Sequence, residues 1–206
     1  MIGKLVSLFV IVTAVAEEGV RPGVITKDDL AEYSSLTGRR KRIVDEALEL
    51  AAKDTWLKYT FGSADPETGG LDCSGSIYYI FREAGLDPPR SSAAQYVWVK
   101  EADALTRIGP STTTLDSAEF DQLRPGDLLF WTGTYEPTDG RKVPVSHVQI
   151  SLGHEKAPGK PVMAGASDGR SYRGIKRTGY GIFDFKLPRP GSKGVFLGYG
   201  LPDSAP

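Results

Sequence analysis

The chain has 206 residues with 25 basic and 26 acidic side chains, so its formal net charge at neutral pH is -1. This balance gives no basis for a nucleic-acid partner or for binding to an anionic membrane surface. The apolar share of 40% is that of an ordinary soluble protein, and the 24 glycines and 14 prolines favour turns and short strands over a helical bundle.

The first 16 residues have the pattern of a secretory signal peptide. A single positive charge precedes an almost wholly apolar run, and Ala14-Val15-Ala16 forms a small-residue cleavage site. The run is too short to span a bilayer, and the alternatives are an N-terminal membrane anchor or a buried strand. We expect residues 1–16 to be a signal peptide, residues 17–40 an N-terminal extension, and residues 41–206 one domain of a protein secreted to the periplasm or the extracellular cell envelope. No integral membrane segment is expected after signal removal.

A first amphipathic helix is predicted after the basic run Arg39-Arg40-Lys41-Arg42. Apolar side chains recur at three- and four-residue spacing from Ile43 to Ala52, and the helix is expected to end near Asp54. The basic run is interpreted as the solvated start of this helix, and contact with an anionic polymer is the alternative.

The only cysteine, Cys73, is expected at the start of a second helix. A turn-rich stretch precedes it, and apolar side chains follow at helical spacing as far as Gly85, a typical C-terminal cap. The unpaired N–H groups of a helix N-terminus favour the thiolate form, so Cys73 is either a nucleophile or a small buried side chain. In an exported protein, an unpaired cysteine lacks a disulfide partner in its own chain, which favours the nucleophile.

Short strands are predicted in the second half of the chain, after a third helix capped by Ser91-Ser92. The strands are expected at residues 128–131, 145–152, 161–166, 182–185 and 195–197, with a polar loop at 133–144 and a Gly- and Arg-rich stretch at 167–181 that is not assigned to a strand. Side chains alternate along a strand, so His147 and Gln149 share one face and Val148 and Ile150 the other.

A cysteine nucleophile needs a base, and the chain has two histidines. His154 follows Gly153 in an expected turn, where a solvated role fits best. His147 lies on an expected strand, and a helix N-terminus packed on this strand would bring Cys73 beside it; taken alone, His147 would be an ordinary surface histidine. One cysteine and two scattered histidines lack zinc-ligand spacing, and no Gly-x-Ser-x-Gly motif is present.

Five segments form an ordered set of motifs from Tyr59 to the strand that contains His147. They are Leu57-Lys58-Tyr59-Thr60-Phe61-Gly62, Gly70-Leu71-Asp72-Cys73-Ser74-Gly75, Pro89-Arg90-Ser91-Ser92-Ala93-Ala94-Gln95, Leu123-Arg124-Pro125-Gly126-Asp127-Leu128-Leu129-Phe130 and Ser146-His147-Val148-Gln149-Ile150-Ser151-Leu152-Gly153. Together they resemble the NlpC-type cell-wall cysteine peptidases, a papain-like family that cleaves peptidoglycan stem peptides.

The resemblance implies an α+β, papain-like fold, with the nucleophile helix packed on a central antiparallel sheet. It implies that Cys73 is the nucleophile and His147 the base, and that no metal or organic cofactor takes part. The implied substrate is a peptidoglycan stem peptide, cleaved at its γ-D-glutamyl–diamino acid bond through a Cys73 thioester.

The resemblance also implies substrate-binding roles for Tyr59, Asp72, Ser74 and Arg90. A carboxylate suits a free amino terminus of the peptide, and an arginine suits its carboxylates. A helix N-cap is the alternative for Asp72. Elsewhere in the motifs, structural roles are expected for Gln95 and Asp127.

Three departures from the family pattern bear on activity. Gly165 stands where relatives usually have a third polar residue that orients the imidazole, and a backbone carbonyl, a water, Ser167 or Asp168 are the candidates to replace it. Gln149, in place of a small residue, either narrows the cleft or helps to hold the imidazole. The loop at 133–144 is long enough to cover the site. The alternatives are therefore an exported cysteine amidase with another substrate and an inactive relative that binds wall peptides.

Overall fold

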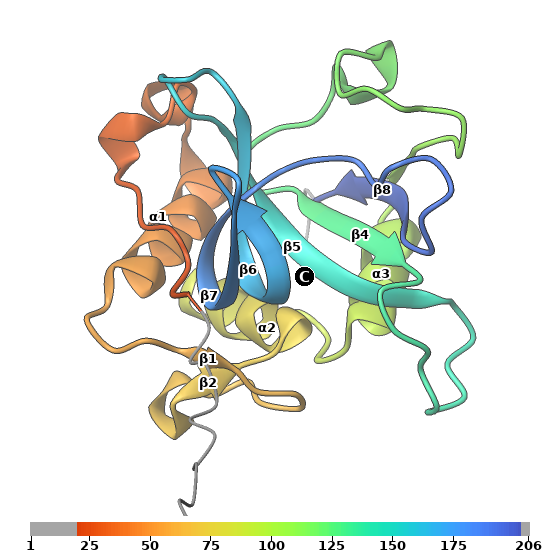
Figure 1. The fold of residues 1–206 in the computed structure, drawn as a ribbon, viewed down its shortest axis with the longest axis horizontal. Helices are drawn as coiled ribbons and strands as arrows, with labels where there is room; N and C mark the ends of the chain where they lie inside the picture. Colours follow the sequence, from red (N-terminus) through yellow and green to blue (C-terminus); the bar gives the residue numbers. More distant parts are fainter. Residues whose placement is uncertain (1–19, 203–206) are drawn as a thin grey trace, which may run out of the picture.

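The computed structural model describes residues 20–202, which form an α+β fold around one six-stranded sheet (Figure 1). The strands are β1 (Lys58–Tyr59), β2 (Gly70–Leu71), β3 (Thr106–Arg107), β4 (Leu128–Thr132), β5 (Val145–His154), β6 (Pro161–Tyr172), β7 (Ile175–Asp184) and β8 (Val195–Gly200). The sheet has the order β3-β8-β4-β5-β6-β7 with antiparallel neighbours throughout, and β1 and β2 form a separate parallel pair. The predicted signal peptide, residues 1–16, lies outside the described residues.

In the described part of the chain, three α-helices pack against the strands: α1 (Gly38–Ala52), α2 (Cys73–Glu83) and α3 (Ser92–Glu101). α2 packs on β5 and β6, α3 on β5, and α1 on β6 and β7. α2 ends as its sequence predicts, because the N–H groups of Gly85 and Leu86 bond back to its last turn at 2.9 and 2.8 Å. Short 3-10 turns lie between the larger elements: η1 (Lys27–Asp29), η2 (Tyr33–Ser35), η3 (Pro66–Thr68) and η4 (Ala118–Phe120).

Two hydrophobic cores hold the sheet. In the first, Val148 of β5 packs with residues of α1 and α2 such as Ile77. In the second, Trp131 of β4 packs with residues of β6, β7 and β8 and with Phe120 of η4. Because apolar side chains cover both faces, His147 is buried although it lies on the face of β5 opposite Val148.

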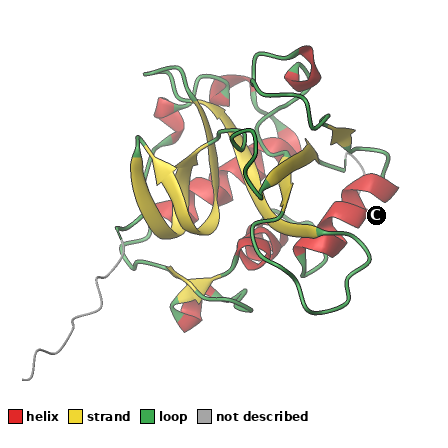
Figure 2. Ribbon diagram, turned by 45° about the vertical axis from the view of Figure 1, so that its right-hand side comes forward, coloured by secondary structure: helices red, strands yellow, loops and turns green. Residues whose placement is uncertain are grey.

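β6 and β7 form a hairpin that is much longer than predicted. The two strands occupy nearly all of residues 167–181, which the sequence pattern left unassigned. Their pairing is interrupted by a bulge between Asp168 and Ser171. Figure 2 shows how strongly the long strands curve.

The glycines of this hairpin interrupt the alternation of side chains that predicts a strand. They occur where other segments pack closely against the backbone. Gly179 of β7 has φ +105°, and a Cβ atom there would lie 2.5 Å from the indole nitrogen of Trp56. A side chain at this position would push β7 away from the segment before β1. The same residues that weaken the sequence signal therefore allow the chain to pack closely.

The described part of the N-terminal extension packs on the sheet. Gly23 pairs with Ile182 of β7, and Leu30 pairs with Glu155 just after β5. Leu30 is almost fully buried in the core that contains α1 and α2. Residues from the extension and from the remainder of the chain therefore share one core.

The basic run lies in the first turns of α1, so its interpretation as a helix start is confirmed. Its members bond to groups of the protein itself: Arg39 to the Pro202 carbonyl oxygen, Arg40 to Asp127, Lys41 to Asp45 and Arg42 to the Ala84 carbonyl oxygen. The bonds of Arg42 and Arg40 tie α1 to the end of α2 and to the turn before β4.

Candidate active site

Cys73 is the first residue of α2, as the turn-rich sequence before it predicts. Asp72 caps the helix by accepting a hydrogen bond from the Gly75 N–H at 2.6 Å. The Ser76 hydroxyl donates to the Cys73 carbonyl oxygen at 2.7 Å and accepts from the Ala166 N–H of β6 at 3.2 Å. These bonds hold the helix start against the sheet and give the sulfur a rigid support.

The Cys73 side chain is buried, with 5% of the residue exposed. The N–H groups of Val148 and Ser74 and the Tyr59 hydroxyl lie against its sulfur. Burial, reinforced by the charge of Asp72, raises the pKa of Cys73 to about 11, although those three donors oppose the shift. The expectation of an easily ionised thiol is therefore wrong for this conformation, because desolvation of the thiolate outweighs the favourable helix N-terminus.

His147 lies on β5, one residue before the Val148 N–H that contacts the Cys73 sulfur. It is directly opposite Trp131 of β4, and the two ring centroids are 5.7 Å apart. α2 packs on β5 as predicted, and this packing brings the helix-borne sulfur to the strand that carries the imidazole.

An arginine that the sequence analysis did not single out holds the imidazole. Nε of Arg170 donates to Nε2 of His147 at 3.2 Å, and its guanidinium lies 4.1 Å from the centroid of the Trp131 ring. Arg170 donates to this nitrogen, whereas Ser167, Asp168, a carbonyl or a water were expected to accept the ring N–H. The only sequence signal was an arginine shortly after Gly165, in a stretch where no strand was predicted.

This contact determines the protonation of His147. An arginine only donates, so the Nε2 that it contacts has no proton and the neutral ring carries its proton on Nδ1. Burial, together with the charge of Arg170, lowers the pKa of His147 well below its ordinary value. Burial also lowers the pKa of Arg170 to about 10, and the nearby Cys73 opposes that shift. Both pKa shifts favour the neutral forms, a thiol at Cys73 and an imidazole at His147.

Gln149 occupies the space that Gly165 leaves open. A Cβ atom on Gly165 would lie 3.1 Å from Cγ of Gln149. The Gln149 side chain is fully buried, and neither its amide nitrogen nor its amide oxygen has a hydrogen-bond partner among the described residues. The large side chain of Gln149 on β5 thus fills the space that Gly165 leaves on the neighbouring strand β6, so the two departures from the family pattern compensate for each other in volume.

The structure brings Asp72, Ser74 and Arg90 together beside the start of α2. Arg90 donates to both oxygens of the Asp72 carboxylate at 2.8 and 3.1 Å and to the Ser74 hydroxyl at 2.9 Å. Asp72 also accepts from the N–H groups of Gly62 and Gly75 at 2.8 and 2.6 Å. The N-cap alternative for Asp72 is therefore observed, and its oxygens are already occupied. Arg90, whose side chain is 37% exposed, is the member of this cluster with free donors.

Gln95 and Asp127 have the structural roles expected of them. The amide nitrogen of Gln95 donates to the carbonyl oxygens of Ser74 and Pro89 at 3.0 and 2.9 Å, which ties α3 to the first turn of α2. Asp127 pairs with Arg40 at 2.8 Å and accepts from the backbone N–H at the start of its own turn.

A cleft of about 490 Å³ opens beside the imidazole. It is lined by Tyr59, Phe61, Thr134, Tyr135, Ser146, His147, Ser167, Asp168, Gly169 and Arg170. Phe61 is 73% exposed and meets Tyr135 edge to face, with ring centroids 6.0 Å apart. The loop at 133–144 therefore borders the cleft through Tyr135, and Tyr59 connects the cleft to the sulfur.

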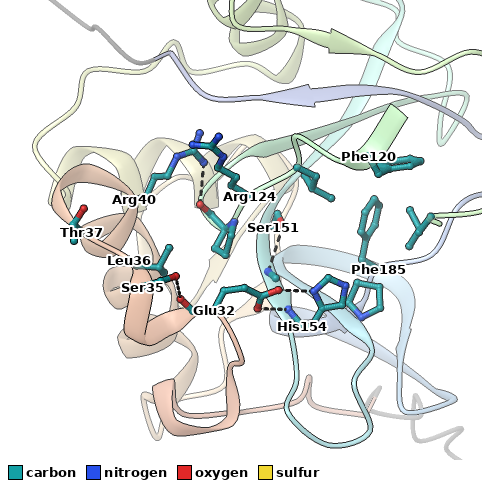
Figure 3. A pocket seen from close by; sticks show the side chains of 15 residues that line it. Glu32, Ser35, Leu36, Thr37, Arg40, Phe120, Arg124, Ser151, His154 and Phe185 are labelled. Atoms are coloured by element: carbon teal, nitrogen blue, oxygen red, sulfur yellow. Dashed lines mark hydrogen bonds and ion pairs between the residues drawn. The ribbon is translucent and has the colours of Figure 1, made fainter. Parts of the chain in front are cut away.

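A second cavity, of about 420 Å³, lies away from this cleft and is lined by neither Cys73 nor His147 (Figure 3). Arg40 and Arg124 lie together on one side of it, and Phe120 and Phe185 on another. His154 borders it and contacts Glu32 through Nδ1 at 2.6 Å. His154 is half exposed, in keeping with its expected place outside the catalytic pair.

Within residues 20–202, no group of three or more His, Cys, Asp or Glu side chains is arranged to hold a metal ion. No helix in the same range has the length and apolar character needed to cross a membrane.

A helix that begins with a cysteine and packs against an antiparallel sheet that carries a histidine is the arrangement of the papain-like fold. The model of the NlpC/P60 family matches residues 56–173, more than half of the chain. The chain therefore belongs to the NlpC/P60 family.

Curated relatives of this chain are named as endopeptidases and hydrolases. The chain is similar to the probable endopeptidase p60 of Listeria monocytogenes, with 33% identity over 134 residues that make up 65% of this chain and 21% of that protein. It is 33% identical over 110 residues to the bifunctional muramidase/DL-endopeptidase CwlT of Bacillus subtilis, covering 53% of this chain and 27% of that one. It is 30% identical over 139 residues to the gamma-DL-glutamyl hydrolase of the same organism, covering 63% and 28%. The chain thus spans less than a third of each relative.

Proposed function

We propose that this protein is a secreted cysteine peptidase of the cell envelope that cleaves peptidoglycan stem peptides at the γ-D-glutamyl–diamino acid bond. The observation that carries the proposal is the Cys73 sulfur at the start of α2, in contact with the Tyr59 hydroxyl and with the backbone next to His147. The names of the relatives, an endopeptidase, a DL-endopeptidase and a gamma-DL-glutamyl hydrolase, support the choice of bond.

In the proposed reaction, the Cys73 thiol gives its proton to His147, and the thiolate attacks the scissile carbonyl carbon. The Cys73 N–H at the helix start and the Tyr59 hydroxyl stabilise the oxyanion. The intermediate collapses as the imidazolium protonates the leaving amine, which leaves a thioester on Cys73. Water, deprotonated by His147, hydrolyses the thioester and restores the thiol. No metal or organic cofactor takes part in these steps.

The cluster of Asp72, Ser74 and Arg90 beside the start of α2 holds the substrate. Arg90 has free donors for a peptide carboxylate, and Ser74 acts through Arg90, because its hydroxyl accepts from Arg90 and donates to Asp72. Asp72 acts through Arg90, because its own oxygens are occupied by internal donors.

Mass spectrometry of digested muropeptides tests the proposal. The intact protein should release fragments that end in γ-D-glutamate and fragments that begin with the diamino acid. Cys73→Ala should release neither, and His147→Ala should lower the rate by orders of magnitude, as removal of a catalytic base does. Identical product profiles for the intact protein and Cys73→Ala would rule out the peptidase.

A second function, binding of wall peptides without cleavage, is favoured by one observation. Arg170 donates to Nε2 of the imidazole and so occupies its proton-accepting nitrogen. Under this alternative, calorimetry would detect binding of a stem tripeptide with equal affinity for the intact protein and Cys73→Ala, and no product would form in prolonged digests.

A further inference from the structure

The contact between Arg170 and His147 is incompatible with the proposed first step. Proton transfer from Cys73 would make an imidazolium, which carries protons on both ring nitrogens. A guanidinium N–H already points at Nε2 from 3.2 Å. Whichever ring nitrogen faces the sulfur, two donors would then oppose one another in a buried site, so Arg170 has to leave Nε2 before His147 becomes a base.

Arg170 is placed where it can leave. It lies in the bulge between Asp168 and Ser171, where the pairing of β6 with β7 is interrupted, and it lines the open cleft. Its guanidinium is held by one hydrogen bond to His147 and by stacking on Trp131. No carboxylate within the described residues forms an ion pair with it. Other arginines do have such a partner: Arg40, Arg82, Arg90, Arg141 and Arg173.

A carboxylate is therefore the group that would draw Arg170 away, because a guanidinium–carboxylate pair is stronger than a bond to a neutral imidazole. A γ-linked glutamyl residue has such a group close to the reacting atom. Its scissile carbonyl belongs to the side chain, so its α-carboxylate stays free, separated from that carbonyl by only two methylene groups and the α carbon. Among α-linked residues, only glutamate has a carboxylate at the same number of bonds from the scissile carbonyl.

On the basis of the proposed function, we infer that Arg170 blocks His147 until substrate binds, and that it recognises the free α-carboxylate of the γ-linked glutamyl residue. We call this contact of Arg170 with His147 the latch. Without substrate, Arg170 holds Nε2 of His147 and keeps the pair inactive. When the scissile carbonyl reaches Cys73, the α-carboxylate pairs with Arg170, and Nε2 is released. Nε2, the ring nitrogen that carries no proton, then takes the Cys73 proton, and the thiolate attacks the carbonyl. Arg170 is thus a positioning and specificity residue, and it takes no proton in the reaction.

The first arm of the test needs no substrate. Iodoacetamide alkylation of Cys73 at pH 7 is compared between the intact protein, Arg170→Gln and Lys176→Gln. Lys176 is an exposed cation on the same hairpin and serves as the matched control. Loss of the latch should raise the alkylation rate about tenfold in Arg170→Gln, the equivalent of one charge-assisted hydrogen bond, with no change in Lys176→Gln. An unchanged or slower rate in Arg170→Gln would overturn the inference, since a slower rate means that the guanidinium serves the thiolate.

The second arm compares kcat/KM for a stem tripeptide with a free glutamyl α-carboxylate and for its α-amide. The intact protein should prefer the carboxylate at least about tenfold, and Arg170→Gln should lose this preference. Arg170→Lys keeps the charge but lacks the Nε donor, so it should retain part of the preference while its thiol reacts faster. Equal preference in all three proteins would overturn the inference.

The two arms separate failure of the latch from failure of the proposed function. If the intact protein cleaves neither peptide, the peptidase proposal fails, while the alkylation rates still test whether Arg170 restrains the Cys73–His147 pair. Thermal unfolding of each variant identifies a fold defect, and Arg170→Lys then provides the measurement in place of Arg170→Gln.

Discussion

The two sides of the cysteine differ in how many hydrogen bonds hold their polar groups. On the helix side, the Asp72 carboxylate accepts from Arg90, Ser74 and two backbone N–H groups, and Gln95 donates twice to carbonyl oxygens, with only its own Oε1 left without a partner among the described residues. On the strand side, the imidazole has one 3.2 Å bond to a described side chain, and neither amide atom of the buried Gln149 has a partner in the same range. The difference teaches that the sulfur has a fixed support, whereas the imidazole can change partners.

Substitution on the helix side of the cysteine should have the largest effect on the free energy of unfolding. Asp72→Ala removes the cap of α2 and leaves Arg90 and the two backbone N–H groups without their shared acceptor. The free energy of unfolding should fall by about 3 kcal/mol, the low end for a broken, largely buried ion pair, since Arg90 is partly exposed. Urea unfolding measures the change.

Asp72→Asn is the matched control for this prediction. Its amide oxygen keeps the cap of α2, but its NH2 group replaces the oxygen that accepts from Gly62 and Arg90, so the charge and one acceptor are lost. The loss should be about half as large as for Asp72→Ala. Equal losses for the two variants would mean that the cap contributes nothing, and no loss in Asp72→Asn would mean that the cluster does not depend on the charge of Asp72.

The strand side should make the free energy of unfolding depend on pH, through His147. Because burial and Arg170 lower the pKa of His147, the unfolded chain binds a proton there below about pH 6.5 while the folded protein does not. The stability that the folded protein has while His147 is neutral in both states is present above that pH and is lost as the pH falls. It should amount to about 1 kcal/mol or more, since each pKa unit is worth ~1.4 kcal/mol.

The measurement is the difference in unfolding free energy between pH 7.5 and pH 5.5, for the intact protein and for His147→Gln. Carboxylates contribute equally to both proteins, so the variant should depend less on pH. A variant with the same or greater pH dependence would show that His147 is not held neutral.

The smallest expected effects come from substitution of the two buried glutamines, Gln149 and Gln95. Gln149→Leu removes two unpaired polar atoms at nearly constant volume and should raise the free energy of unfolding by about 1 kcal/mol. Gln95→Leu should lower it by about 1–2 kcal/mol, because two carbonyl oxygens lose their donor. Thermal unfolding of both variants gives the comparison. A loss in Gln149→Leu as large as that in Gln95→Leu would mean that the amide of Gln149 is satisfied in solution.

Local chemistry was enough to predict the framework of the site. The turn before Cys73, the apolar spacing after it and the alternation around His147 each depend on neighbouring residues, so they indicated a helix, a strand and the packing between them. The structural roles of Gln95 and Asp127 followed from the motifs in which they occur. The papain-like fold came from the order of those motifs along the chain.

Tertiary structure alone decided what surrounds the imidazole. Residues 167–181 lack strand alternation because their glycines serve close packing against other segments, so the long β6–β7 hairpin was missed, and Arg170 with it. The protonation of Cys73 was decided in the same way, because the cost of burial depends on the whole fold and exceeded the local effect of the helix N-terminus. Spacing along the chain predicts which groups are held by their neighbours, but it does not predict which distant side chain fills a gap such as the one at Gly165.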